Sequence, residues 1–148
     1  MQGGLRSDCA ALNGLCETLL ASGVKVRVLR DPTRGGAATT LNEFIEGTAL
    51  GIELDEKLIP VSPGVQAACG MLGLDPLYCA NEGKLLAVVA PEDAERAAEI
   101  MRGTEAGRNA AVIGEVTEDH PGKLVMNTSF GGRRILQKLT GAQLPRIC

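Results

Sequence analysis

The sequence predicts an α/β fold of the α+β type, a sandwich in which helices pack on a mixed sheet. Helix and strand patterns alternate along the chain, and 45% of its residues are hydrophobic. Only 2% are aromatic, with no Trp, so Ala, Val, Leu and Ile must build the core, which suits close packing of helix on sheet. A chain of 148 residues is long enough for one domain with a core and too short for two of ordinary size.

Periodicity predicts the elements of the first half. Apolar residues at helical spacing after Ser7 predict a helix that ends at Gly23, with Cys9 and Cys16 facing the core. Ser62 and Pro63 are the N-cap and N1 residues of a later helix. In chain order, we expect a helix over residues 8–22, a strand over 24–28, a helix over 37–50, a strand over 51–54 and a helix over 62–71.

The second half begins with a loop around Pro76 and continues with the apolar run 84–90, which is typical of a central strand. Pro91 opens the next helix, which ends near Gly103. His120 lies in a predicted hairpin turn and receives no role. The remaining strands are predicted over residues 109–116, 123–128 and 134–139.

Composition argues against several classes of function. A net charge of −3, scattered basic residues and few aromatic residues do not favour nucleic-acid binding. No apolar run is long enough to span a membrane, and residues 1–4 do not resemble a signal peptide, so we expect a cytoplasmic protein. Five cysteines without a Cys-x-x-Cys pair, and a single His, indicate free thiols and no metal site. Cys69 and Cys79 could pair under oxidation, but we expect both to be reduced.

A glycine-rich turn follows the first predicted strand. Thr33, Arg34, Gly35 and Gly36 stand between a strand and a helix, so their N–H groups and the positive helix end could hold a phosphate, with Arg34 as a charged donor. Asp31 could orient Arg34. The turn matches neither common phosphate-loop motif, and a tight turn that needs two glycines explains it equally well.

The last residue, Cys148, is a thiol at the end of the segment Leu144-Pro145-Arg146-Ile147-Cys148. Pro145 stiffens this segment, so residues 140–148 are predicted to form an arm that moves a group bound to sulfur between sites. An incidental cysteine on a frayed terminus is the alternative. A free thiol has a pKa of about 8.5, so a carrier thiol needs a nearby base.

Four segments resemble the HypE family of nickel–iron hydrogenase maturation factors, which are carbamoyl dehydratases of the PurM-like, aminoimidazole ribonucleotide synthetase superfamily. They are residues 29–36 (LRDPTRGG), 80–85 (ANEGKL), 111–116 (AVIGEV) and the ending Pro-Arg-Ile-Cys. The resemblance implies a PurM-like C-terminal domain over residues 1–139 and a flexible tail over 140–148. It also implies that the N-terminal domain, which binds ATP, is absent from this chain.

The resemblance further implies a chemistry. The carbamoyltransferase HypF would place a carboxamide on Cys148, and ATP with Mg would drive its dehydration to a thiocyanate, with Glu82 as the base. The cyanide would pass to iron on a HypC–HypD complex, and the complete protein would be a homodimer. Two alternatives stay open: a non-catalytic carrier and docking fragment, or another PurM-like enzyme that uses ATP, such as a selenophosphate or thiamine phosphate enzyme.

Overall fold

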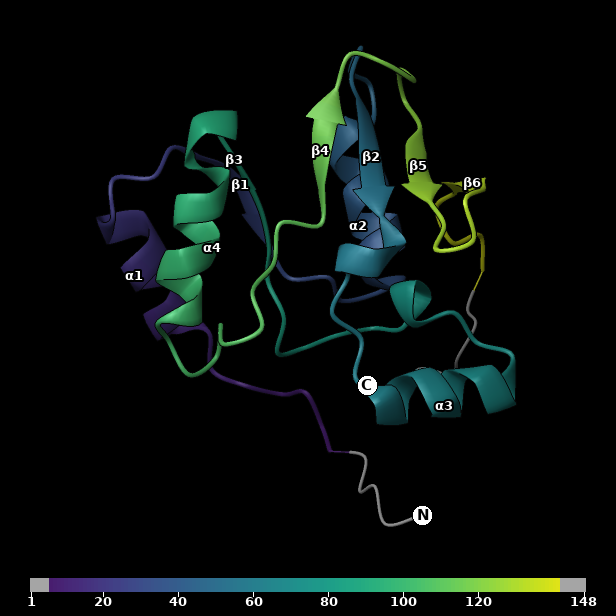
Figure 1. The fold of residues 1–148 in the computed structure, drawn as a ribbon, viewed down its shortest axis with the longest axis horizontal. Helices are drawn as coiled ribbons and strands as arrows, with labels where there is room; N and C mark the ends of the chain where they lie inside the picture. Colours follow the sequence, from purple (N-terminus) through teal and green to yellow (C-terminus); the bar gives the residue numbers. More distant parts are fainter. Residues whose placement is uncertain (1–5, 142–148) are drawn as a thin grey trace.

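The computed structural model describes residues 6–141, which form a mixed α/β fold with two sheets (Figure 1). The fold class predicted from the sequence is confirmed. In chain order the helices and strands are α1 (Asn13–Ala21), β1 (Val26–Arg30), α2 (Gly36–Ile45), β2 (Gly51–Asp55), α3 (Pro63–Leu72), β3 (Leu86–Val89), α4 (Ala94–Arg102), β4 (Gly114–Thr117), β5 (Leu124–Asn127) and β6 (Arg133–Leu136). Short 3₁₀ turns cover Glu56–Leu58, Pro76–Tyr78 and Pro91–Asp93.

The larger sheet has four strands in the order β4-β2-β5-β6 and is mixed, because β2 is parallel to β5 and antiparallel to β4. Helix α2 covers one face of it (Figure 1). The main core lies between them and consists of Ala38, Leu41, Ile45, Ile52, Leu54, Leu124, Met126 and Leu136. Burying these aliphatic side chains is the principal stabilising contribution to this part of the fold.

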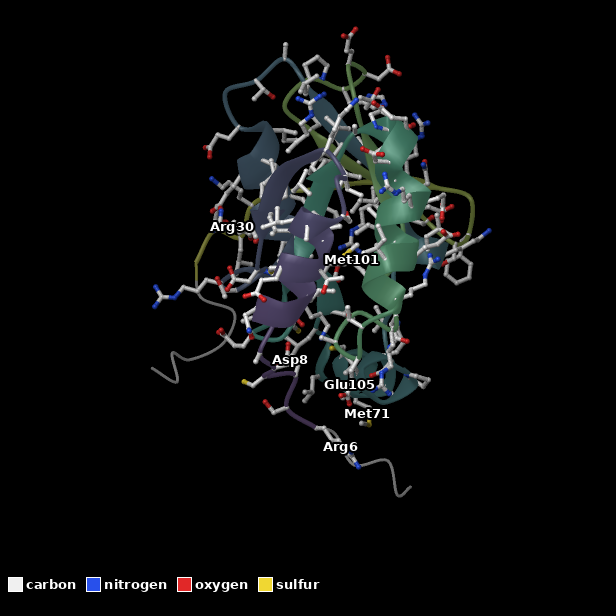
Figure 2. All side chains as sticks on the ribbon, turned by 90° about the vertical axis from the view of Figure 1, so that its left-hand side faces the viewer. Arg6, Asp8, Arg30, Met71, Met101 and Glu105 are labelled. Carbon is white, nitrogen blue, oxygen red and sulfur yellow. The ribbon has the colours of Figure 1, made fainter. Side chains whose placement is uncertain are left out.

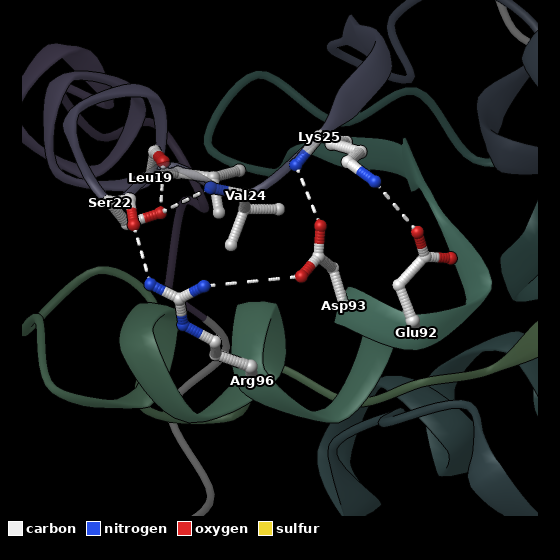
Figure 3. A network of polar contacts seen from close by, with 7 residues as sticks. All are labelled: Leu19, Ser22, Val24, Lys25, Glu92, Asp93 and Arg96. Carbon is white, nitrogen blue, oxygen red and sulfur yellow. Dashed lines mark hydrogen bonds and ion pairs between the residues drawn. The ribbon is translucent and has the colours of Figure 1, made fainter.

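A second core lies where α1 and α4 pack over the antiparallel pair β1 and β3 (Figure 1). Leu19, Val24 and Ala97 are its buried residues. Polar contacts join its edges: Asp93 accepts the Lys25 N–H at 2.9 Å, and Arg96 donates to the Ser22 carbonyl at 2.6 Å (Figure 3). Lys25 and Arg96 are exposed, whereas Asp93 is half-buried, so each contact contributes modestly to stability and mainly fixes the geometry.

The prediction of a central strand over residues 84–90 was wrong. Strand β3 pairs only with β1, and its four residues are partly buried. Leu86 packs against the main core, whereas Ala87 and Val89 pack against the second core. The apolar run is continuous because this strand serves two cores, and not because it lies in the middle of one sheet.

The first helix begins at Asn13, five residues later than predicted. The preceding segment is held away from α1, because the Asp8 carboxylate accepts the Glu82 N–H and pairs with Lys84. Cys9 is therefore exposed, which contradicts its predicted core position, and Cys16 is half-buried.

Two further predictions need correction. Helix α2 ends at Ile45 because Glu46 is extended and Gly47 has a positive φ of 73°, so the predicted continuation to residue 50 does not form. The segment 118–122 is not a hairpin turn, because β4 and β5 lie on opposite sides of β2. The predicted helices at Pro63 and after Pro91 are confirmed.

Candidate functional site

The glycine-rich turn connects β1 to α2, as the sequence predicts. Gly35 is the N-cap residue of α2 with a φ of 76°, and Gly36 follows with a φ of 64°. Both values lie in the left-handed region that favours glycine. The Gly36 N–H donates to the Thr33 carbonyl at 3.0 Å, and the Arg34 side chain is exposed. The turn therefore presents Arg34 at the positive end of the helix.

The second predicted motif, Asn81-Glu82-Gly83, packs directly against this turn. The Asn81 N–H donates to the Pro32 carbonyl at 3.0 Å, and the Asn81 amide donates to the Cys79 carbonyl at 2.7 Å. A Cβ atom on Gly36 would lie 2.6 Å from the carbonyl oxygen of Cys79. Only a residue without a side chain permits this approach, so packing explains Gly36, and the possible phosphate site is reduced to Thr33, Arg34 and Gly35.

Glu82 is exposed, and its backbone is held by the segment that precedes α1. Asp8 accepts the Glu82 N–H at 3.1 Å and lies 3.5 Å from the Lys84 ammonium nitrogen. Figure 2 shows Asp8 just below α1. A Cβ atom on Gly83 would lie 2.9 Å from the Ala10 nitrogen, so the two backbones are in close contact. The turn is thus fixed on both sides, while the Glu82 carboxylate faces solvent.

Two residues after β6 are bonded to the body at the same place. The Leu139 N–H donates to the Thr39 hydroxyl oxygen at 3.2 Å, and the Tyr78 hydroxyl donates to the Gln137 carbonyl at 2.9 Å. Thr39 lies in the first turns of α2, and Tyr78 comes just before Cys79. The start of the C-terminal segment therefore lies beside both motifs.

Cys148 lies outside the described residues. It is nine residues beyond Leu139 (148 − 139), and nine extended residues span at most about 30 Å. The exposed carboxylate and the exposed guanidinium of the two turns are suited to removing a proton and to holding an anion, respectively.

The predicted contact between Asp31 and Arg34 does not form: within residues 6–141, no ion pair joins them. The cysteines at positions 69 and 79 are both free, as expected. Burial, and then the neighbouring Cys69 thiol, raise the pKa of the Cys79 thiol, which favours its protonated form.

A cavity of about 480 Å³ beside the turn Pro76–Tyr78 contains none of the predicted site residues among its described lining. Glu56 and Arg134 line it, and each already has a partner: Ser129 donates two hydrogen bonds to Glu56, and Arg134 pairs with Asp75. The hydrogen bonds from Ser129 lower the pKa of Glu56. These charges are satisfied locally, so this cavity is a weaker candidate than the two packed turns.

Sequence reasoning missed three residues of the site, namely Asp8, Thr39 and Tyr78. Each contributes through a contact with a residue far away in the sequence. The sequence offered one hint of a role for Tyr78, because it is the single tyrosine of the chain. It offered no hint of a role for Asp8 or Thr39.

In the described part of the chain, no three side chains of His, Cys, Asp or Glu are grouped so that they could hold a metal ion. No helix between residues 6 and 141 has the length and apolar character needed to cross a membrane.

The family described as AIR synthase related protein, C-terminal domain, matches residues 3–127. The carbamoyl dehydratase HypE of Cupriavidus necator is 56% identical over 144 residues, which are 97% of this chain and 41% of that protein. The HypE of Escherichia coli is 42% identical over the whole chain and 43% of that protein. The chain thus spans about two-fifths of the length of these relatives.

Solved structures agree with the sequence matches. A crystal structure of the hydrogenase maturation protein HypE in complex with ATP has a TM-score of 0.88 and 44% identity, over 96% of this chain and 44% of that chain. HypE in a HypE–HypF complex has a TM-score of 0.87 and 42% identity, over 94% of this chain and 45% of that chain. The chain therefore belongs to the AIR synthase-related family as a C-terminal domain of that family, and the relatives that it resembles are HypE hydrogenase maturation proteins.

Proposed function

We propose that this chain is the C-terminal part of a carbamoyl dehydratase that makes the cyanide ligands of the nickel–iron hydrogenase centre in the cytoplasm. Residues 1–139 would form the PurM-like C-terminal domain and residues 140–148 the carrier arm. The observation that supports this most is the start of the arm at Leu139, which is bonded to Thr39 beside the two packed turns. A carrier thiol needs such a starting point close to the base that serves it.

The reaction begins when the carbamoyltransferase HypF places a carboxamide on the sulfur of Cys148. Transfer of a phosphoryl group from ATP to the amide oxygen then turns a poor leaving group into a good one. Glu82 removes one proton from nitrogen, and the second nitrogen proton leaves with the phosphate as the carbon–oxygen bond breaks and phosphate departs with its electron pair. The products are a thiocyanate on Cys148, ADP and phosphate, and cyanide passes to iron on a HypC–HypD complex.

ATP and Mg would be held mainly by an N-terminal domain, in a homodimer of the complete protein. Arg34 fits a supporting role toward the phosphates, since it is exposed at the N-terminus of α2. Gly36 does not fit a direct role, because its N–H is bonded to Thr33 and its open side is filled by the Cys79 carbonyl. Thr33 and Gly35 complete the proposed phosphate contact.

A second function is that of a carrier and docking module without catalysis of its own. The observation that favours it is that Glu82 is exposed, so the described residues do not by themselves enclose its carboxylate. The two proposals agree on the role of Cys148 and differ on where the dehydration occurs. A different ATP-dependent enzyme of the PurM-like class would not need Cys148 at all.

One experiment separates the three. The chain is incubated with HypF, carbamoyl phosphate and ATP, with and without an added N-terminal half, and the mass of the peptide that contains Cys148 is measured. We expect a carboxamide on Cys148 in both mixtures, and loss of water only when the N-terminal half is present. Cys148 unmodified in every mixture would rule out the cyanide route.

Two variants refine the result. Cys148→Ser should acquire no carboxamide at this peptide and serves as the blank. Glu82→Gln keeps the shape of the side chain and removes its basicity, so carbamoylation should be unchanged while dehydration slows by about 10²-fold or more. Dehydration at the parent rate would remove Glu82 from the mechanism and leave the carrier role intact.

A further inference from the structure

One side chain of the segment that precedes α1 holds the turn at Glu82. The Asp8 carboxylate accepts the Glu82 N–H at 3.1 Å and lies 3.5 Å from the Lys84 ammonium nitrogen. Within the described part of the chain, residues 82–84 make no hydrogen bond to a distant segment other than these two. Asp8 is therefore the hydrogen-bonding anchor of this turn.

The backbones of the two segments are also in close contact. A Cβ atom on Gly83 would collide with the Asp8 carbonyl oxygen and would lie 2.9 Å from the Ala10 nitrogen. The Asp8 side chain is 31% exposed, so water competes only partly for its carboxylate. A charged acceptor makes a stronger hydrogen bond to an N–H group than a neutral one does. Asp8 thus holds the turn by its side chain and packs against it by its backbone.

The Glu82 carboxylate depends on this backbone for its position. Between residues 6 and 141, no ion pair joins it to a cation. A general base must come within about 3 Å of the proton that it removes, and a misplacement of about 1 Å can slow a reaction about 10²-fold. The contact that fixes the backbone of Glu82 therefore bears on its use as a base.

We propose that Asp8 is a positioning residue for Glu82 and that it acts by accepting the Glu82 N–H. This inference rests on the proposed function. Asp8 does not touch the reacting atoms; it keeps the turn where the Glu82 carboxylate meets the nitrogen proton of the substrate. The ion pair with Lys84 contributes less, because the Lys84 side chain is 52% exposed.

The test follows the single-turnover dehydration of carbamoylated Cys148 by mass in the full-length enzyme. Asp8→Ala removes the acceptor, so the turn spends less time in the productive geometry and dehydration should slow about tenfold. Carbamoylation by HypF, and the ATP concentration that gives half the maximal rate, should be unchanged. Asp8→Asn retains an acceptor oxygen and should recover most of the rate. Lys84→Met removes the ion pair alone and should stay within about twofold of the parent.

Asp93→Ala is the matched control. Asp93 also accepts a backbone N–H, that of Lys25, at 2.9 Å, and lies 4.0 Å from the Arg96 guanidinium (Figure 3). Arg96 in turn donates to Ser22 at the C-terminal end of α1, whereas Asp8 precedes the N-terminal end of that helix. Because the Asp93 side chain is only 14% exposed, Asp93→Ala should lower the free energy of unfolding at least as much as Asp8→Ala. It should leave dehydration at the parent rate.

A double variant separates positioning from a structural role. Glu82→Gln lacks the base, so the addition of Asp8→Ala to it should slow dehydration no further. If Asp8 only stabilised the fold, Asp8→Ala would slow the parent and Glu82→Gln by the same factor.

The outcomes are distinct. Dehydration at the parent rate in Asp8→Ala would overturn the role of Asp8, and so would an equal loss in Asp93→Ala, Asp8→Asn or Lys84→Met. Glu82→Gln at the parent rate would remove the base and this inference with it. A parent enzyme that never dehydrates Cys148 would overturn the proposed function itself.

Discussion

Substitution of Gly36 by Ala tests whether the two turns of the site are packed as closely as the structure has them. A positive φ costs a residue with a Cβ atom about 1–2 kcal/mol. The new Cβ would also lie 2.6 Å from the Cys79 oxygen and 2.8 Å from the Tyr78 carbonyl carbon, both of which are backbone atoms. Overpacking of this kind costs about 1–3 kcal/mol, so the free energy of unfolding should fall by about 2–5 kcal/mol.

Gly73→Ala is the matched control for this prediction. Gly73 has a φ of 67°, close to the 64° of Gly36, but no heavy atom lies within 4 Å of the position that its Cβ would take. In Gly73→Ala, the free energy of unfolding should therefore fall only by the cost of the positive φ, about 1–2 kcal/mol. Urea unfolding followed by circular dichroism gives both values, provided that the free energy of unfolding falls with urea concentration at the same slope in both variants and the parent. Equal losses in the two variants would refute the close approach of the turns.

Three other predictions concern the entrance segment, the cavity and the core. Asp8→Ala should free the turn at Glu82, and hydrogen exchange of the Glu82 amide should become at least about fivefold faster, because a hydrogen bond to a charged group is lost; an unchanged exchange rate would contradict the contact. Hydrogen bonds from Ser129 lower the pKa of Glu56, so its stabilising contribution is present above the unfolded value, about 4.3, and is lost as pH falls through the lower folded value. In Glu56→Gln, the free energy of unfolding should accordingly fall less steeply than in the parent as pH is lowered below about 4.3, as urea titrations at several pH values would show. Leu124→Ala should cost about 2–5 kcal/mol, since Leu124 is 0% exposed, whereas Leu20→Ala, at 58% exposed, should cost less than about 0.5 kcal/mol in the same assay.

The types of most elements could be predicted from the sequence because their signals are local. Pro63 at the first position of α3, Gly23 after α1 and Pro91 just before α4 are each signals that act within one or two helical turns. The strand–turn–helix unit around Gly35 and Gly36 was likewise predictable. Local signals do not assign the roles of Glu82 and Cys148; these roles came from the resemblance to a family and stay proposals.

Tertiary structure alone decided the strand partners and the assembly of the site. Strand β3 has the composition of a central strand, yet it pairs only with β1 because its side chains are divided between two cores. Asp8 meets Glu82 across 74 residues, and Thr39 meets Leu139 across 100. Local propensity carries no information on such contacts, because they depend on which buried surfaces pack together once the whole chain has folded.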